Sequence, residues 1–387
     1  MKKNWMKVAV VAMSCMMAFA FVGCGSSESA DTGDADVLKI GGVGPLTGPA
    51  ALYGNAVKNG AQLAVDEINA ANDGLKIEFS MEDDEHDAEK SVNAYNKLVD
   101  DGMQILVGTV TTAPCTAVAA EAYEDRVFAL TPSASGPAVT SGNDNVYQLC
   151  FSDPNQGVAA ADYIADNMAG SKVGIIYNNA DNYSSGIYDK FKSEAEAKGL
   201  SIVATEAFSD DANADFTAQL NSMKSAGADL LFLPIYYTPA SNIITQASKM
   251  GYAPTYFGVD GMDGILGLEG FDTSLAEGVL LLTPFTAYSE EENSKAFTEA
   301  YEAAYGELPI QFAADAYDCI YAVYGAFIEA GCSTSDDAAT ICEAMIECFN
   351  GGFQFSGLTG DCTWASTGEV DKTPKVCVIQ DGKYIEK

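Results

Sequence analysis

The feature that most constrains the fold is a pair of small, polar loops that each follow a short apolar run. Loop Gly108–Thr112 follows the run 104–107, and loop Thr131–Ser135 follows the run 127–130. Residues 113–125 between them have a helical pattern, so this region predicts a strand–helix–strand unit with neighbouring parallel strands. Both loops would then lie at the carboxyl edge of one sheet, which is where open α/β sheets bind ligands.

Hydroxyl side chains are concentrated in these two loops. Thr112, Ser133 and Ser135 each carry a group that can both donate and accept a hydrogen bond. Any one of them would fit equally well as a helix cap or a turn residue. Because both loops carry them, the pair favours a site for a small polar ligand.

Strands and helices alternate through the rest of the chain. Four strands separated by helices, one of them predicted at 56–69, precede a strand at 146–151. The pattern then restarts after the turn at 153–157 and continues with strands and helices to about residue 283. Since a single core rarely grows beyond about 250–300 residues, this chain of 387 residues is expected to form two α/β lobes with parallel sheets.

The charge of the chain excludes some classes of partner. Its formal net charge is −35, from 55 acidic and 20 basic residues, and such a surface repels phosphate backbones. Nucleic-acid binding is therefore not expected. Arg126 is the only arginine in the sequence, so an anionic ligand would have to be held by hydroxyls, backbone amides and helix termini rather than by a guanidinium.

The N-terminus has the pattern of an export signal. Lysines precede an apolar run at 8–22 that is shorter than the roughly 20 residues of a membrane-spanning helix. The run ends at Gly23-Cys24, which resembles a lipobox. We therefore predict a signal peptide over 1–23, lipidation of Cys24 and a flexible tether over 24–36, with a plain secretory signal as the alternative.

Cysteine and histidine are not arranged as in metal sites. No Cys-x-x-Cys sequence occurs, so buried thiols are favoured over disulfides, although connectivity cannot be read from sequence. His86 is the only histidine, and its acidic loop 82–87 lacks the spacing of an EF-hand. We expect no metal and no cofactor. Apart from Cys15 and Cys24, the cysteines are Cys115, Cys150, Cys319, Cys332, Cys342, Cys348, Cys362 and Cys377.

An ordered set of short motifs resembles the leucine/isoleucine/valine-binding proteins, which are type I extracellular solute-binding proteins of ABC importers. The resemblance covers essentially all of residues 37–387. Each motif is weak alone, but their order and spacing are specific. The motifs are Ile40–Gly48, Tyr53–Gly54, Asp83–Asp84, Gly108–Thr112, Leu130–Ser135, Asp153–Gly157, Asn182–Ser184 and Gly258–Gly261.

The resemblance implies two Rossmann-like lobes of the periplasmic-binding-protein type I class, with a ligand cleft between them and three crossovers. One lobe would comprise 37–152 plus 285–375, and the other 153–284 plus 376–387. An amino acid would be enclosed when the lobes close about their hinge.

The resemblance also implies which residues bind the ligand. Thr112 and the loop around Ser133 would bind the α-carboxylate and part of the ammonium group, and Asp260 would pair with the ammonium. The family usually has glutamate there, so the shorter aspartate is a departure that would require a bridging water or a more deeply placed ligand. The implied ligand-binding residues are Tyr53, Thr112, Ser133, Ala134, Ser135, Tyr183, Tyr237, Asp260 and Phe312.

The function that follows is capture of an amino acid with an apolar or aromatic side chain and delivery to an ABC permease. The protein is expected to be an extracytoplasmic, membrane-anchored monomer and not an enzyme, because no hydrolase, metalloprotease or phosphate-loop motif occurs. A ligand-sensing domain for a receptor and an α/β enzyme are the alternatives. The sequence leaves open which amino acid is bound.

Overall fold

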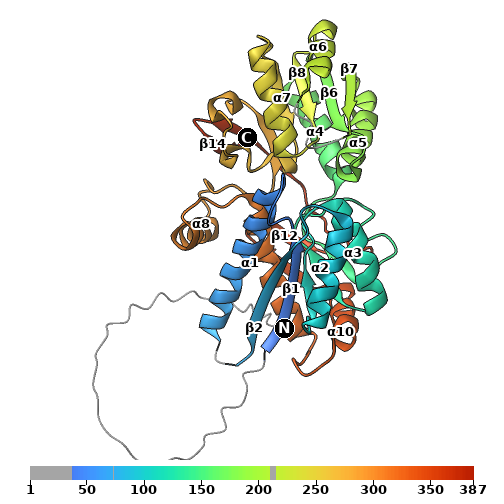
Figure 1. Cartoon of the computed structure of the whole chain (residues 1–387), viewed down its shortest axis with the longest axis vertical. Coiled ribbons are helices and arrows are strands. Elements are labelled where there is room, and N and C mark those ends of the chain that lie inside the picture. The colour runs from blue at the N-terminus through green and yellow to red at the C-terminus, as the bar shows by residue number, and fades with distance from the viewer. Residues whose placement is uncertain (1–36, 73, 210–214) are drawn as a thin grey trace, which may run out of the picture. The chain divides into compact units, whose positions relative to one another are not determined.

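Two sheets organise the described part of the chain, which comprises residues 37–72, 74–209 and 215–387 of a computed structural model (Figure 1). The first sheet has the strand order β2-β1-β3-β4-β5, and the second has the order β14-β13-β10-β9-β8-β6-β7. The predicted fold of two α/β lobes is confirmed. The predicted signal peptide 1–23, tether 24–36 and lipidation site Cys24 lie outside the described residues.

The first lobe is built on a fully parallel sheet. Its short central strands are buried on both faces, as expected of a parallel sheet covered by helices. The unit β3–α3–β4 confirms the predicted strand–helix–strand segment. The strands are β1 (Val37–Gly44), β2 (Lys76–Asp83), β3 (Ile105–Val107), β4 (Phe128–Thr131) and β5 (Val146–Gln148).

Side-chain alternation along β3 distributes the core between two helical layers. Ile105 and Val107 belong to the cluster that includes α1, α9 and α10, whereas Leu106 belongs to the cluster of α2 and α3. The eighth helix, α8, contacts α1. The helices are α1 (Ala51–Ala71), α2 (Ala88–Asp100), α3 (Thr112–Asp125), α8 (Glu292–Tyr305), α9 (Gln311–Glu329) and α10 (Ala338–Asn350).

The second lobe has five parallel strands and an antiparallel pair at one edge. Its strands are β6 (Lys172–Asn178), β7 (Ser201–Phe208), β8 (Leu230–Leu233), β9 (Thr255–Gly258), β10 (Leu280–Thr283), β13 (Lys375–Gln380) and β14 (Lys383–Glu386). Its helices are α4 (Asp153–Asn167), α5 (Asn182–Lys198), α6 (Thr217–Ala226) and α7 (Tyr237–Lys249), with the 3₁₀ turns η1 (Asp260–Met262), η2 (Ile265–Gly267) and η3 (Thr273–Ala276).

The chain passes between the two lobes three times, as expected. It crosses between β5 and α4, returns between β10 and α8, and crosses again between the hairpin β11 (Gln354–Gly357)–β12 (Gly360–Thr363) and β13. Loops at the carboxyl ends of strands from both sheets line one pocket, and this arrangement places the candidate site.

Some local predictions were wrong. Helix α1 begins at Ala51 rather than at residue 56, so Tyr53 lies in its first turn and not in a loop. Strand β5 ends at Gln148 rather than at residue 151, because the following residues lead into the crossover.

The eight cysteines in the described residues are free thiols, six of them buried. Within the same residues, every helix is too short or too polar to cross a bilayer.

Candidate functional site

One pocket lies where the two polar loops of the first lobe face the second lobe. It contains about 230 Å³ of empty space, including the solvent at its mouth. Six of the predicted ligand-binding residues line it, and they come from both lobes. The full lining is Tyr53, Val110, Thr111, Thr112, Ser133, Tyr183, Tyr236, Asp260, Gly261 and Phe312.

Thr131 holds the two loops of the first lobe together. Its hydroxyl donates to the carbonyl of Thr109 over 2.6 Å and accepts the N–H groups of Ser133 and Ala134 over 3.3 and 3.0 Å. Because β3 and β4 are parallel neighbours, these loops leave the sheet side by side, as predicted. The backbone near the pocket is thus fixed by a buried side chain rather than by a ligand.

The side of the pocket formed by the first lobe offers hydrogen-bond donors but no cationic side chain. The N–H of Gly136 donates to Thr112 Oγ1 over 3.3 Å, so the hydroxyl hydrogen of Thr112 remains free to donate. Thr112 is also the first residue of α3, whose N-cap, Thr111, makes no side-chain capping bond. The start of a helix carries unpaired N–H groups and a partial positive charge, which suits a carboxylate.

Asp260 provides the opposite charge from the second lobe. It is the first residue of η1, separated from β9 only by Val259, and is almost fully buried. Its Oδ1 accepts the hydroxyl of Tyr183 over 2.5 Å and the N–H of Gly261 over 2.8 Å. Burial raises the pKa of Asp260 to about 6, although these hydrogen bonds oppose the shift. A cationic group in the pocket would stabilise its ionised form.

Aromatic rings form the remaining walls. Tyr183 and Tyr236 are stacked with ring centroids 4.8 Å apart and planes within 7° of each other. Tyr53 packs against Phe312 with centroids 4.3 Å apart. Apolar surface of this kind favours an apolar or aromatic ligand side chain.

Three of the predicted residues do not line the pocket. Ala134 uses its N–H to bind Thr131, and Ser135 accepts the N–H of Asp153 with its carbonyl over 3.0 Å. Tyr237 lies behind Tyr53, with its ring edge-on at 4.8 Å and its N–H donating to the Tyr53 hydroxyl over 3.3 Å. Tyr237 therefore supports the wall rather than forming it. A direct ligand contact by these three residues stays a prediction.

Four lining residues were not identified from the sequence. Val110 and Thr111 belong to the predicted polar loop, and Gly261 follows Asp260, so their neighbourhood was the available signal. Tyr236 is the adjacent tyrosine to the one predicted. It lies at the N-cap of α7, and the sequence does not show which of two successive tyrosines faces the cleft.

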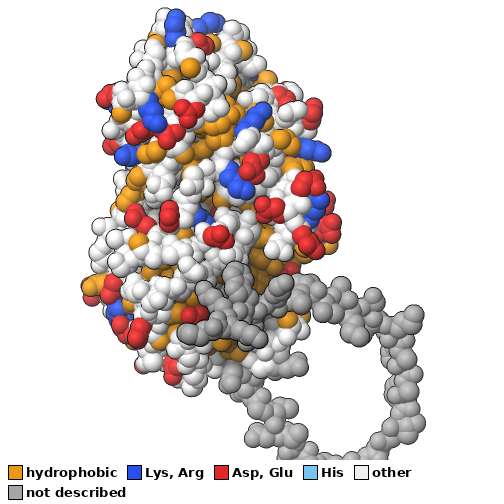
Figure 2. All heavy atoms as spheres, turned by 180° about the vertical axis from the view of Figure 1, so that it is seen from behind, with side chains coloured by type: hydrophobic (Ala, Val, Ile, Leu, Met, Phe, Trp, Pro, Cys, Tyr) orange, Lys and Arg blue, Asp and Glu red, His pale blue; other side chains and the backbone are white. Residues whose placement is uncertain are grey.

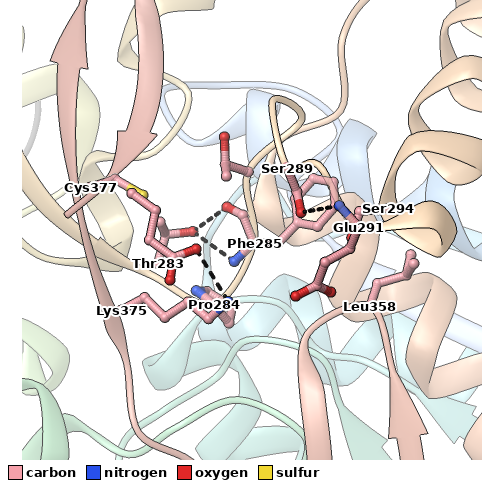
Figure 3. A pocket seen from close by; sticks show the side chains of 11 residues that line it. Thr283, Pro284, Phe285, Ser289, Glu291, Ser294, Leu358, Lys375 and Cys377 are labelled. Atoms are coloured by element: carbon pink, nitrogen blue, oxygen red, sulfur yellow. Dashed lines mark hydrogen bonds and ion pairs between the residues drawn. The ribbon is translucent and has the colours of Figure 1, made fainter.

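A second cavity lies beside the crossover segments (Figure 3). Its polar groups bind one another: the Thr283 hydroxyl donates to the carbonyl of Phe285 over 2.7 Å, and Lys375 lies 3.3 Å from Glu386. None of the predicted ligand-binding residues lines it. The first pocket is therefore the candidate site, and residues 37–72, 74–209 and 215–387 contain no cluster of three potential metal ligands.

Comparison with known proteins gives a consistent result. A family described as periplasmic binding protein matches residues 37–378. The Leu/Ile/Val-binding protein BraC3 of Rhizobium johnstonii is 31% identical, over 86% of this chain and 89% of that protein. The Leu/Ile/Val-binding protein homolog 3 of Brucella melitensis is 29% identical, over 96% and 98% of the two chains.

A solved structure of similar sequence has the same fold. The branched-chain amino acid transporter substrate-binding protein LivJ of Streptococcus pneumoniae, in complex with isoleucine, has a TM-score of 0.81 and 29% identity. The similarity covers 91% of this chain and all of that one. The described part of the sequence is thus accounted for by one fold.

Proposed function

Because the chain belongs to the periplasmic binding protein family, as its motifs predicted, we propose that it encloses an amino acid between its lobes for an ABC importer. It is a solute-binding protein and not an enzyme. One observation carries the proposal. Asp260 of the second lobe and Thr112 of the first lobe, with its hydroxyl and the start of α3, line the same pocket.

This pair of walls suits a zwitterion. An enclosed ammonium or carboxylate loses its hydration, which costs several kcal/mol per ion unless the site replaces it. Asp260, held by Tyr183, would pair with the ammonium. Thr112 and the first N–H groups of α3 would bind the carboxylate. The hydroxyl oxygen of Ser133 would accept a hydrogen bond from the ammonium group. No Lys or Arg is among the residues that line the pocket.

The apolar walls define the ligand side chain. Tyr53, Tyr183, Tyr236 and Phe312 would contact it. Ligand contact by Ala134, Ser135 and Tyr237, the last of which packs edge-on against Tyr53, stays a prediction. We propose a branched-chain or other apolar amino acid, which agrees with the leucine, isoleucine and valine in the names of the relatives.

Calorimetric titration of the purified protein with L-leucine, L-isoleucine and L-valine tests this proposal. We expect binding of at least one, and a loss of about 10–100-fold in affinity for Asp260→Asn, because a hydrogen bond to a charged group contributes about 1.5–3 kcal/mol. The exposed Asp189→Asn on α5 is the matched control. Absence of binding to these and the other standard amino acids, or full affinity of Asp260→Asn, would refute the proposal.

The arrangement of the lobes supports a closing motion. The lobes would comprise 37–152 with 285–375, and 153–284 with 376–387. What supports this division is that the strands of the first sheet fall within 37–148 and those of the second within 172–283 and 375–386, with Lys375 at the boundary. A ligand that contacts both walls would stabilise the closed form.

We also propose that Cys24 is lipidated and holds the exported monomer at the outer face of the cell membrane, where it meets the permease. The support is the apolar run that ends in Gly23-Cys24. Cys24→Ala is expected to move the protein from the membrane fraction to the soluble fraction without changing ligand affinity. Retention in the membrane would contradict anchoring at Cys24.

A further inference from the structure

The turn that carries Asp260 is held by both lobes. Within the second lobe, the N–H of Asp260 donates to Gln156 Oε1 over 3.0 Å, and the N–H of Asp263 closes the turn on the Asp260 carbonyl over 2.9 Å. From the first lobe, Gln311 makes two further bonds to the same turn. The acid of the proposed ammonium site is therefore supported across the cleft.

Gln311 is built for this contact. It is the first residue of α9 and only 2% exposed. Its N–H donates to Asp263 Oδ2 over 2.8 Å, and its side-chain Nε2 donates to the carbonyl of Asp260 over 2.9 Å. A carboxylate at a helix N-terminus is stabilised by the unpaired N–H groups and the helix dipole, so the bond to Asp263 is charge-assisted.

These bonds lie directly behind the pocket. Phe312 follows Gln311 on α9 and lines the pocket, as do Asp260 and Gly261 of the turn. A ligand and Gln311 would thus hold the same turn from opposite sides. If the lobes separate, the N–H of Gln311 and the carboxylate of Asp263 return to water, so both bonds require the lobes to be together.

We propose that Gln311 is a positioning residue that sets the place of Asp260 and couples the ammonium-binding turn to lobe closure. The proposal rests on the amino-acid-binding function given above. Other contacts across the cleft, such as the hydroxyl of Tyr53 donating to the carbonyl of Gly261 and that of Thr238 donating to the carbonyl of Pro49 over 2.9 Å, assist closure, but only Gln311 bonds directly to the backbone of Asp260 among the described first-lobe residues.

Gln311→Met tests the role of the amide, because methionine has a similar length but no donor. With L-leucine as the probe in stopped-flow measurements, we expect the dissociation rate to rise about tenfold while the association rate changes less than twofold. Loss of general structure would instead lower the fraction of active protein, or change both rates. Gln62→Met, on the outer part of α1 in the same lobe, is the control and should leave both rates unchanged.

A second readout does not depend on the ligand. In small-angle X-ray scattering without added amino acid, Gln311→Met is expected to have a larger radius of gyration than the native protein. The reason is that the closed form of the variant lacks the hydrogen bond from Gln311 to the Asp260 carbonyl. Asp263→Asn keeps the size of the side chain but removes its charge, so it should change scattering and dissociation in the same direction. This second variant keeps the test decisive if Gln311→Met folds poorly.

The outcomes separate the two proposals. If no amino acid binds to the native protein, the proposed function fails, while the scattering arm still decides whether Gln311 favours closure. If L-leucine binds but Gln311→Met and Asp263→Asn leave both the dissociation rate and the radius of gyration unchanged, the role of Gln311 is refuted. A slower association rate with an unchanged dissociation rate would refute it equally.

Discussion

At the scale of single residues, three buried carboxyl groups have their pKa raised to about 6 by burial: Asp84, Asp260 and Asp263. Asp260 and Asp263 belong to the proposed site and its support, where a ligand or a helix terminus faces them. Asp84 has no such role. Its carboxylate accepts the N–H of His86 over 2.8 Å and the hydroxyl of Ser91 over 3.0 Å, and it shapes the loop between β2 and α2.

Asp84→Asn is therefore predicted to stabilise the protein at neutral pH. The folded-state pKa of Asp84, about 6, exceeds the unfolded value of 3.8, so the folded state binds a proton more tightly. Stability is lost as the pH rises from about 4 through about 6 and is constant above. An asparagine at position 84 can accept a hydrogen bond from the N–H of His86 and donate one to the hydroxyl oxygen of Ser91. The variant therefore avoids this loss of folding stability, which is at most about 3 kcal/mol.

Urea denaturation of Asp84→Asn and of the native protein at pH 4.5 and pH 7.5 measures this effect. The gain in the free energy of unfolding should be larger at pH 7.5, and the exposed Asp189→Asn should change little at either pH. An equal difference between variant and native protein at both pH values would contradict the prediction.

The site could be predicted from sequence only in part, and the residues show why. The loops at Thr112 and Ser133 were found because small polar residues after apolar runs mark the carboxyl ends of strands. Asp260 was predicted to bind the ligand only because it matches a family motif, since an aspartate before glycine is also a common turn residue. Tyr236 and Gln311 carry no such pattern: their roles depend on side-chain direction and on a contact between segments distant in sequence.

At the scale of elements, α1 and α9 make the most extensive helix contact among the described elements of the first lobe. Gly60 of α1 lies against the backbone of Ala313, so that a Cβ at position 60 would overlap the Ala313 carbonyl oxygen and stand 2.7 Å from its carbon. The contact matters for the site because α1 carries Tyr53 and α9 carries Gln311 and Phe312.

Gly60→Ala is predicted to destabilise the protein. The overlap is with backbone, which cannot rotate away, so the overpacking cost of typically 1–3 kcal/mol or more outweighs the gain of roughly 1 kcal/mol in helix propensity. Gly325→Ala on α9 is the matched control, because its added Cβ would stand 3.7 Å from the ring of Phe353, an ordinary contact.

The two variants should therefore have opposite effects in thermal and urea unfolding. Gly325→Ala is expected to gain about 0.5–1 kcal/mol, while Gly60→Ala loses stability. If both variants were stabilised, the close approach of α1 and α9 would not exist in solution.

Elements were predicted better than their ends. Strand–helix alternation indicated most of the strands and helices because each has a clear apolar pattern. The start of α1 at Ala51 was missed because Gly48-Pro49 reads as a turn and Gly54 interrupts the helical pattern. The 3₁₀ turn η1 was missed as well, since a turn of three residues has no periodicity to detect.

At the scale of the whole molecule, the two lobes follow from chain length and from the restart of the strand pattern after β5, whereas the three crossovers were expected only from the family resemblance. Which lobe receives the C-terminal strands did not follow from the pattern. β13 pairs antiparallel with β10, a contact between segments almost a hundred residues apart, and it was assigned only through the family resemblance. Long-range pairing is set by shape and packing, which a local pattern does not contain.

The net charge of −35 affects the stability of the folded chain. Figure 2 shows acidic side chains spread over the visible face, with fewer basic ones between them. The folded state brings these charges closer together than the unfolded state, so mutual repulsion lowers its stability. Salt shortens the Debye length from about 30 Å at 0.01 M to about 8 Å at 0.15 M and should reduce that repulsion.

We therefore predict that the free energy of unfolding at pH 7 rises between 10 and 150 mM NaCl, on the order of 1 kcal/mol or more. The ion pairs oppose this trend only weakly, because Lys97–Glu82 and Lys198–Asp162 are partly exposed. Replacing the exposed Glu124, Glu196 and Glu299 together by glutamine should raise stability at 10 mM NaCl and shrink the response to salt. Urea denaturation across this salt range measures both effects. A stability that fell with NaCl, or a triple variant with the native salt response, would mean that specific ion pairs rather than general repulsion govern how charge acts on this fold.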